Sequence, residues 1–202
     1  MTRRFAPFAS ASRRQADPVD LLIACSSGGH VIELLALREA WHGFERVWVS
    51  DDTTDVRSLL ADESVYFAAG PTTRNARAFL RNLVLAWRLQ RRHRPRVVLA
   101  AGGATAVPFA WVSRLHGGRV VFVECLTRID KPSLSYRLIA PVADRLYVQW
   151  PELARNARAR YVGRIPLLAL GYVRETRRSD LLTRAAVGAA QEAARTTSAA
   201  RG

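Results

Sequence analysis

The sequence predicts an α/β protein with a Rossmann-like, mostly parallel sheet that helices cover on both faces. Three observations predict it. Short runs rich in Val, Leu and Ile alternate with runs of helical periodicity, the strand-like runs are mostly apolar, and a glycine pair lies in the loop after two of them. Strands that are apolar on both sides are typical of parallel sheets buried between two helical layers. The chain has 202 residues and is 49% hydrophobic, which excludes a wholly disordered protein.

The strands are predicted from β-rich apolar runs that stop at turn-forming residues. The first run, residues 19–25, stops at Ser-Ser-Gly-Gly-His, and the run at 97–101 stops at Gly-Gly. Six strands are expected at residues 19–25, 46–50, 65–67, 97–101, 120–123 and 145–148, and residues 159–162 add one more.

The helices are predicted between these strands from apolar residues at helical spacing. Residues 31–42 are the first such stretch, and Thr53 or Thr54 is expected to cap the second. A long helix should end before Pro95, because proline cannot continue a helix. The expected helices cover residues 31–42, 54–61, 73–92, 105–115 and 133–141.

One folded domain is expected over residues 19–172, between a basic, flexible head (1–18) and a tail (173–202). The tail is rich in Ala, Arg, Thr and Ser and is predicted to be helical or disordered. The longest uncharged run, residues 97–113, is shorter than the roughly 20 residues that a membrane-spanning helix needs. We therefore expect a soluble or peripheral protein.

The charge is strongly positive, with 31 basic and 17 acidic residues and a formal net charge of +14. Such a charge indicates an anionic partner: nucleic acid, a phospholipid surface or a phosphorylated substrate. The chain contains only two cysteines, Cys25 and Cys125, at matching strand ends, and small buried side chains are the expectation for both. No cluster with ligand spacing indicates a metal, and no cofactor is predicted.

The loop Ser26–His30 is the strongest candidate site. In an open parallel sheet, ligands bind beyond the carboxyl ends of the strands. Glycines there let backbone N–H groups approach an anion, and the following helix presents its positive end. We expect Ser26, Ser27, Gly28 and Gly29 to bind an acceptor or phosphate. The alternative is a tight strand-to-helix turn without a ligand.

Two side chains are candidates for proton transfer. His30 lies at the start of a helix, where the helix dipole disfavours the protonated imidazole; the alternative is a histidine that only closes the turn. Glu124 ends a very apolar strand, and a partly desolvated carboxylate suits proton transfer; the alternative is an ion pair with Arg128 or another arginine. Asp51 lies where a dinucleotide-binding fold holds a ribose, although the glycine pattern of that fold is absent.

Residues 74–96 contain eight arginines and no acids. On a helix, five of them form one stripe bordered by Leu85, Leu89 and Val84, an arrangement typical of a helix on a membrane surface. The stripe consists of Arg74, Arg77, Arg81, Arg88 and Arg92, while Phe79, Leu80, Leu83 and Trp87 are predicted to face the core. A solvated face is the alternative. Nucleic acid would use the same charges, but no known nucleic-acid-binding pattern is present.

Four short sequences, in this order, carry a family resemblance. They are Ser26-Ser-Gly-Gly-His30, Arg94-Pro-Arg-Val-Val-Leu followed by Ala101-Gly-Gly103, Phe122-Val-Glu124, and Tyr147-Val-Gln-Trp-Pro151. Together they resemble the Alg14-like proteins, which include bacterial polysaccharide-biosynthesis subunits of the PssD type. The resemblance covers roughly residues 19–167.

The resemblance implies the N-terminal, acceptor-side half of a GT-B glycosyltransferase that works on exopolysaccharide or lipid-linked oligosaccharide. An Alg13-like or PssE-like chain would bind the UDP-sugar, and the acceptor would be a polyprenyl-pyrophosphate-linked saccharide at the cytoplasmic face of an anionic membrane. Gly28, Gly29 and His30 would face the acceptor's pyrophosphate and reacting hydroxyl. Gly102 and Gly103 would line the same cleft, with Glu124 near the seam between subunits.

Three functional hypotheses follow from the sequence. The first is a glycosyltransferase subunit, inactive alone, with His30 or Glu124 as general base. The second is a stand-alone nucleotide- or NAD-binding Rossmann protein that uses Ser26–His30 and Asp51. The third is a basic nucleic-acid-binding module, which we do not favour.

Overall fold

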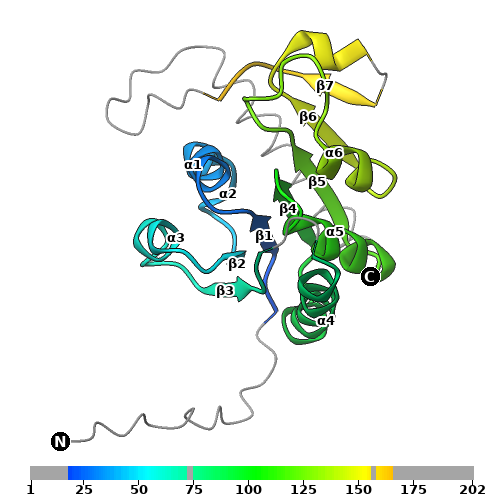
Figure 1. The fold of residues 1–202 in the computed structure, drawn as a ribbon. Coiled ribbons are helices and arrows are strands. Elements are labelled where there is room, and N and C mark those ends of the chain that lie inside the picture. The colour runs from blue at the N-terminus through cyan, green and yellow to red at the C-terminus, as the bar shows by residue number, and fades with distance from the viewer. Residues whose placement is uncertain (1–17, 72–74, 156–157, 166–202) are drawn as a thin grey trace, which may run out of the picture.

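The computed structural model describes residues 18–71, 75–155 and 158–165, which form one seven-stranded sheet in the order β3-β2-β1-β4-β5-β6-β7 (Figure 1). All neighbouring strands are parallel. The strands are β1 Leu21–Cys25, β2 Arg46–Asp51, β3 Val65–Ala68, β4 Val97–Ala101, β5 Arg119–Val123, β6 Arg145–Val148 and β7 Ala159–Tyr161. The Rossmann-like class and the predicted strands are confirmed. The domain limits stay a prediction, since residues 1–17 and 166–202 lie outside the described ranges.

The helices alternate with the strands as predicted, except that one expected helix is divided into two. The expected helix over 31–42 is interrupted at Leu37, which lies between two shorter helices. Side chains cap two of the others: the Asn75 carbonyl accepts from the N–H of Ala78, and the Ser133 hydroxyl accepts from the N–H of Tyr136. The helices are α1 Gly29–Ala36, α2 Arg38–Trp41, α3 Thr54–Leu59, α4 Ala76–His93, α5 Ala106–Leu115 and α6 Leu134–Ile139, with a 3₁₀ turn, η1, at Pro151–Arg155.

The helices form a layer on each face of the sheet (Figure 1). Alternate residues of the central strands supply the two cores. Ile23 of β1 packs on the side of α1, α2 and α3, with Leu34 and Trp41. Leu22 packs on the other side, with Phe109 of α5 and the inner residues of α4 and α6. Burial on both faces explains why the strands are apolar throughout.

The orientation of α4 differs from the prediction. Its buried side carries small and polar residues: Ala78, Asn82, Ala86, Leu89, Gln90 and His93. The residues predicted to face the core are exposed, with Leu80 at 64% and Trp87 at 47%. We call Phe79, Leu80, Leu83, Val84 and Trp87 the apolar face of α4.

Polar pairing explains this orientation of α4. The Asn82 side chain accepts from the N–H of Ala69 at 2.7 Å and donates to the Ala69 carbonyl at 3.1 Å. His93 Nε2 lies 2.7 Å from the hydroxyl of Tyr66 on β3. Because these polar groups find partners against the sheet, their burial is offset, while the alanines allow the helix to approach closely.

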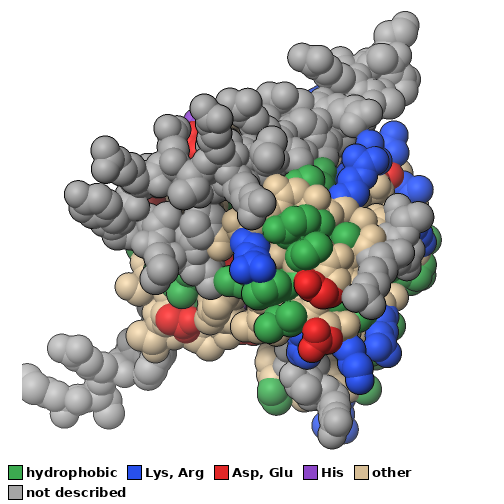
Figure 2. Space-filling model, turned by 90° about the horizontal axis from the view of Figure 1, so that it is seen from above, with side chains coloured by type: hydrophobic (Ala, Val, Ile, Leu, Met, Phe, Trp, Pro, Cys, Tyr) green, Lys and Arg blue, Asp and Glu red, His purple; other side chains and the backbone are tan. Residues whose placement is uncertain are grey.

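Apolar side chains are also exposed on the neighbouring helices. Trp111 and Leu115 of α5 and Leu134 and Leu138 of α6 are among them. On the face shown in Figure 2, exposed hydrophobic side chains lie beside both basic and acidic ones. No helix in the described part of the chain combines the length and apolar character needed to cross a membrane.

Candidate functional site

Three predicted loops come together at the carboxyl edge of the sheet. The strands β1, β4 and β5 are neighbours and parallel, so the segments that follow them lie side by side. These segments contain Ser26–His30, Gly102–Gly103 and Glu124. The chain also reverses direction across the sheet between β1 and β4, which is where ligands bind in open α/β sheets.

The two glycines after β4 are required by close contact with the loop after β1. A Cβ at position 102 would overlap the imidazole of His30, and a Cβ at position 103 would overlap the side chain of Ser26. Both glycines also have positive φ, at 32° and 70°. Gly102 therefore lies directly against His30, and Gly103 lies directly against Ser26.

His30 occupies the first turn of α1, and its imidazole is favoured in the neutral form. Burial, and secondarily the positive charge of Arg128, lower the pKa of His30 below its usual 6.5, while Asp51 acts in the opposite direction. Its Nδ1 is buried and has no hydrogen-bond partner among the described residues. A neutral imidazole of this kind can accept a proton at neutral pH.

The loop amides expected to bind an anion already have acceptors. The N–H of Ser27 donates to Asp51 Oδ2 and the N–H of Gly28 donates to Asp55 Oδ2, both at 3.1 Å. Asp51 Oδ1 also accepts from the hydroxyl of Thr105 at 2.8 Å. A phosphate could reach these two amides only if both carboxylates moved away.

Glu124 occupies a different environment from the one predicted. It is fully buried, and its two carboxylate oxygens accept from the N–H groups of Cys125 at 2.9 Å and Ser133 at 2.8 Å. Within the described residues no ion pair joins Glu124 to Arg128 or to another arginine. The carboxylate closes the loop from Glu124 to Ser133 rather than facing an open cleft.

Sequence reasoning missed Glu33, which is at the centre of a buried polar network. Its Oε1 accepts from Cys125 Sγ at 3.2 Å and from the N–H of Leu126 at 3.1 Å, and its Oε2 accepts from Gln149 Nε2 at 3.2 Å. The side-chain amide oxygen of Gln149, Oε1, in turn accepts from the N–H of Ile165 at 2.8 Å. Glu33 therefore ties α1 to the segments that follow β5, β6 and β7.

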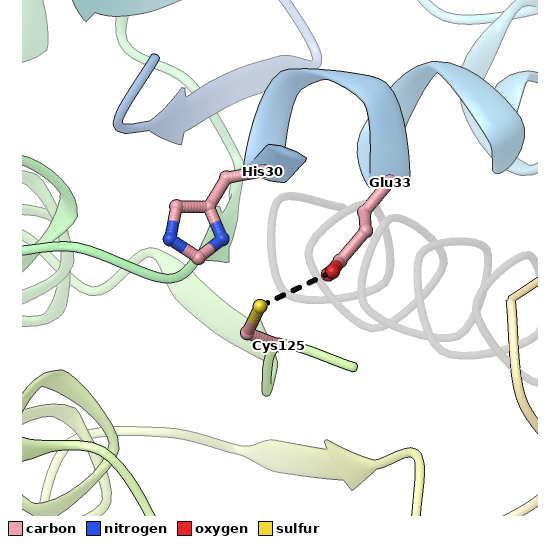
Figure 3. Close-up of side chains that lie close together, drawn as sticks. All are labelled: His30, Glu33 and Cys125. Atoms are coloured by element: carbon pink, nitrogen blue, oxygen red, sulfur yellow. Dashed lines mark hydrogen bonds between the residues drawn. The ribbon is translucent and has the colours of Figure 1, made fainter. Parts of the chain in front are cut away.

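His30, Glu33 and Cys125 form the compact group drawn in Figure 3, with donor atoms within 4.8 Å of one another. Imidazole, carboxylate and thiolate are ligands that Zn²⁺ accepts. However, burial raises the pKa values of both Glu33 and Cys125, which disfavours the carboxylate and thiolate forms that bind a metal. The sequence could have suggested Glu33, three residues after His30 on one helix, but not Cys125, which is distant in sequence.

Cys25 behaves as predicted. It is completely buried, and burial raises its pKa to about 12, so the thiolate that reacts as a nucleophile does not form near neutral pH.

The comparisons with known proteins point in one direction. A sequence model of the family described as "Oligosaccharide biosynthesis protein Alg14 like" matches residues 64–165. The UDP-N-acetylglucosamine transferase subunit ALG14 of Eremothecium gossypii is 33% identical over 181 residues, which cover 72% of this chain and 80% of that protein.

Two further matches are to longer chains. The UDP-N-acetylglucosamine–N-acetylmuramyl-(pentapeptide) pyrophosphoryl-undecaprenol N-acetylglucosamine transferase of Herminiimonas arsenicoxydans is 25% identical over 150 residues, 68% of this chain and 41% of that protein. The crystal structure of MurG from Acinetobacter baumannii superposes with a TM-score of 0.61 and 19% identity over 78% of this chain. The match spans 47% of the MurG chain, so the present fold corresponds to about half of that protein.

Proposed function

Because the chain belongs to the Alg14-like family of oligosaccharide-biosynthesis proteins, we propose that it is the acceptor-binding subunit of a two-chain glycosyltransferase. A second chain, Alg13-like or PssE-like, binds a UDP-sugar, and this chain binds a polyprenyl-pyrophosphate-linked saccharide. The proposal rests on the site at the carboxyl edge of the sheet. There, His30 and the glycine-containing loops after β1 and β4 belong to a single domain. That domain matches about half of the MurG chain.

The chemistry assigned to this site is sugar transfer with His30 as general base. The neutral imidazole accepts the proton of the acceptor hydroxyl while the hydroxyl oxygen attacks C1 of the donor sugar. The bond between C1 and the UDP oxygen breaks, and UDP leaves with the electron pair. We assign this role to His30 rather than Glu124 because both oxygens of Glu124 are occupied by backbone N–H groups.

The acceptor's pyrophosphate requires positive groups near His30. The N–H groups of Ser27 and Gly28 are bound to carboxylates in this structure. The first turn of α1 begins at Gly29. The N–H groups of Val31 and Ile32 donate to the Gly28 carbonyl, which leaves the N–H groups of Gly29 and His30 for an anion. We propose that these amides and the exposed Arg128 face the pyrophosphate. The positive charge of Arg128 already acts on His30.

Association with the cytoplasmic face of the membrane is assigned to α4. Arg77, Arg81, Arg88 and Arg92 are exposed, and they border the exposed apolar face of α4 on one side. Arginines beside exposed apolar residues suit a helix that lies in the interface between lipid headgroups and acyl chains. The fifth predicted residue of the stripe, Arg74, lies outside the described residues.

The environment of Asp51 argues against the hypothesis of a stand-alone NAD-binding protein. Its two carboxylate oxygens accept hydrogen bonds from Ser27 and Thr105. In this arrangement Asp51 braces the loop after β1 against α5 and does not offer a free carboxylate to a ribose.

The deciding experiment compares the chain alone with the chain plus its donor-binding partner. Calorimetric titration with UDP-N-acetylglucosamine should show weak or no binding to the lone chain and clear binding to the mixture. Transfer of labelled sugar to a polyprenyl-pyrophosphate acceptor should occur only in the mixture. Tight donor binding, tight NAD binding or sugar transfer by the lone chain would contradict the proposal.

A further inference from the structure

A basic cavity lies at the amino-terminal edge of the sheet, opposite the candidate site. It has a volume of about 410 Å³ and is bounded by the end of α4, the segment that enters β4 and the turn that follows α5. Its wall includes Trp87, Arg91, Arg94, Arg96 and His116. The cavity residues Arg94 and Arg96 precede β4, whereas His30 contacts Gly102, which follows β4. The cavity and the His30 site therefore lie at opposite edges of the sheet.

The cavity is positively charged, since none of the described residues that line it is acidic. Arg91 and Arg94 are exposed. The third arginine, Arg96, has its NH1 3.9 Å from an oxygen of Asp20, and both side chains are more than a third exposed. An ion pair this long and this exposed neutralises little of the charge.

Arg94 has a backbone conformation that helix geometry alone does not favour for arginine. Its φ of 47° and ψ of 49° are left-handed, and its N–H donates to the carbonyl of Gln90 to end α4. Glycine is the usual residue at this position, and other residues adopt it at a cost of about 1 kcal/mol. Residues held in such sparsely populated backbone conformations cluster at functional sites.

One rim of the cavity is apolar. The Trp87 ring meets the His116 ring edge-on, with 4.6 Å between centroids. Trp87 is also the last member of the apolar face of α4, and Leu115, next to His116, is 74% exposed. The arginines and the exposed apolar surface therefore meet at this cavity.

We propose that the cavity binds the phosphate group of an anionic phospholipid, whose acyl chains lie along the apolar face of α4. Arginine guanidinium groups bind phosphate oxygens through charge-assisted hydrogen bonds, and the apolar rim suits the attached lipid. This inference rests on the proposed membrane association, to which it adds a specific headgroup site that does not use the arginine stripe.

The test uses the full chain and the variants Arg94→Gly and Arg91→Gln. Binding is measured by cosedimentation with vesicles of phosphatidylcholine, with and without phosphatidylglycerol. Each variant should bind the anionic vesicles about fivefold more weakly, since a basic residue at a membrane surface contributes about 1 kcal/mol. Arg38→Gln removes an exposed arginine of α2 and is the matched control, which should bind as the wild type does. The melting temperature of Arg94→Gly should equal or exceed that of the wild type, because glycine suits its backbone.

The outcomes separate this inference from the proposed function. Unchanged vesicle binding by both cavity variants, or an equal loss in Arg38→Gln, overturns the headgroup site while leaving the arginine stripe to be judged by its own variants. Calorimetry with soluble glycerol phosphate distinguishes the source of the anion. If glycerol phosphate binds the cavity as tightly as anionic vesicles do, or if the wild type binds no vesicles, the lipid assignment is wrong.

Discussion

The imidazole of His30 lies directly against the Cα of Gly102, so no side chain fits at position 102. The two residues come from different loops, one after β1 and the other after β4. This contact sets the position of the ring that we assign as general base, so Gly102 would be a positioning residue in the proposed reaction.

We expect Gly102→Ala to displace the His30 ring and to lower kcat of the two-chain enzyme by about 100-fold, the effect of a misplacement near 1 Å. The positive φ of 32° adds a stability cost of about 1 kcal/mol. Gly117→Ala is the matched control for stability, because Gly117 has a φ of 79° and open space around its Cα. Thermal unfolding of both variants separates backbone strain from displacement of the ring, and a Gly102→Ala enzyme with normal kcat would contradict the assignment.

His30→Ala should lower kcat by 10²- to 10⁴-fold, the usual contribution of a general base. The pKa of His30 is below 6.5 because of burial and Arg128, so the neutral form persists on mild acidification. The wild-type pH–rate profile should therefore stay level down to about 6.5 and fall only at lower pH. This acid limb should disappear in the variant, and its persistence there would assign it to another group.

Glu33→Ala should lower the free energy of unfolding by about 2–3 kcal/mol, because the N–H of Leu126 and the amide of Gln149 lose a buried acceptor. Glu39→Gln, at an exposed position of α2, should change it by less than about 0.5 kcal/mol. Chemical denaturation of both variants at neutral pH measures the difference.

The pH dependence of stability offers a second test of Glu33. Burial raises its pKa above 4.5, so the native state keeps the proton to higher pH than the unfolded chain does. Stability due to this group is therefore greatest below about 4.5 and decreases as the pH rises through the raised pKa. Glu33→Gln should remove this component from a series of denaturation curves, and unchanged curves would show that Glu33 does not titrate as stated.

Glu124→Gln should mainly affect stability, by about 1–3 kcal/mol, because one of two buried N–H groups then meets an amide donor. At a temperature where the variant is folded, kcat of the two-chain enzyme should fall by less than tenfold. A loss comparable to that of His30→Ala, in a variant whose circular dichroism is unchanged, would return Glu124 to the list of candidate bases.

Charge reversal at Arg77, Arg81 and Arg88 should reduce cosedimentation with anionic vesicles by about 100-fold, on the basis of roughly 1 kcal/mol for each arginine. Leu80→Ser on the apolar face of α4 should weaken binding to neutral vesicles as well. Arg160→Glu, an exposed position on β7, is the control. If the triple variant binds as the wild type does, these arginines only form a solvated face.

The strands and the edge that carries the site could be predicted from sequence, because those signals are local. A continuous apolar run predicts a doubly buried strand, and the glycines after β1 and β4 mark where the backbone turns. The acceptors of Ser27 and Gly28 could not be predicted in the same way. Asp51 and Asp55 reach these amides only once β2 lies beside β1.

The orientation of α4 is a second feature that could not be predicted from the sequence. A prediction from apolar periodicity assumes that the apolar side of a helix faces the core. In α4, however, Asn82 is hydrogen-bonded to the backbone of Ala69, just after β3. His93 is hydrogen-bonded to Tyr66, within β3. Those partners are distant enough in the chain that the helical pattern does not reveal them. The four described arginines of the stripe are exposed, whereas the neighbouring apolar side was predicted in the wrong environment.

This arrangement of α4 has an evolutionary consequence. Asn82, Ala86 and the other inward residues fix how the helix sits on the sheet, while Leu80 and Val84 point outward and take little part in the core. Mutations on the outer side can therefore accumulate with little penalty to folding. Selection on the outer side should therefore act through membrane association, which requires that side to stay apolar, while selection on the inner side acts through folding.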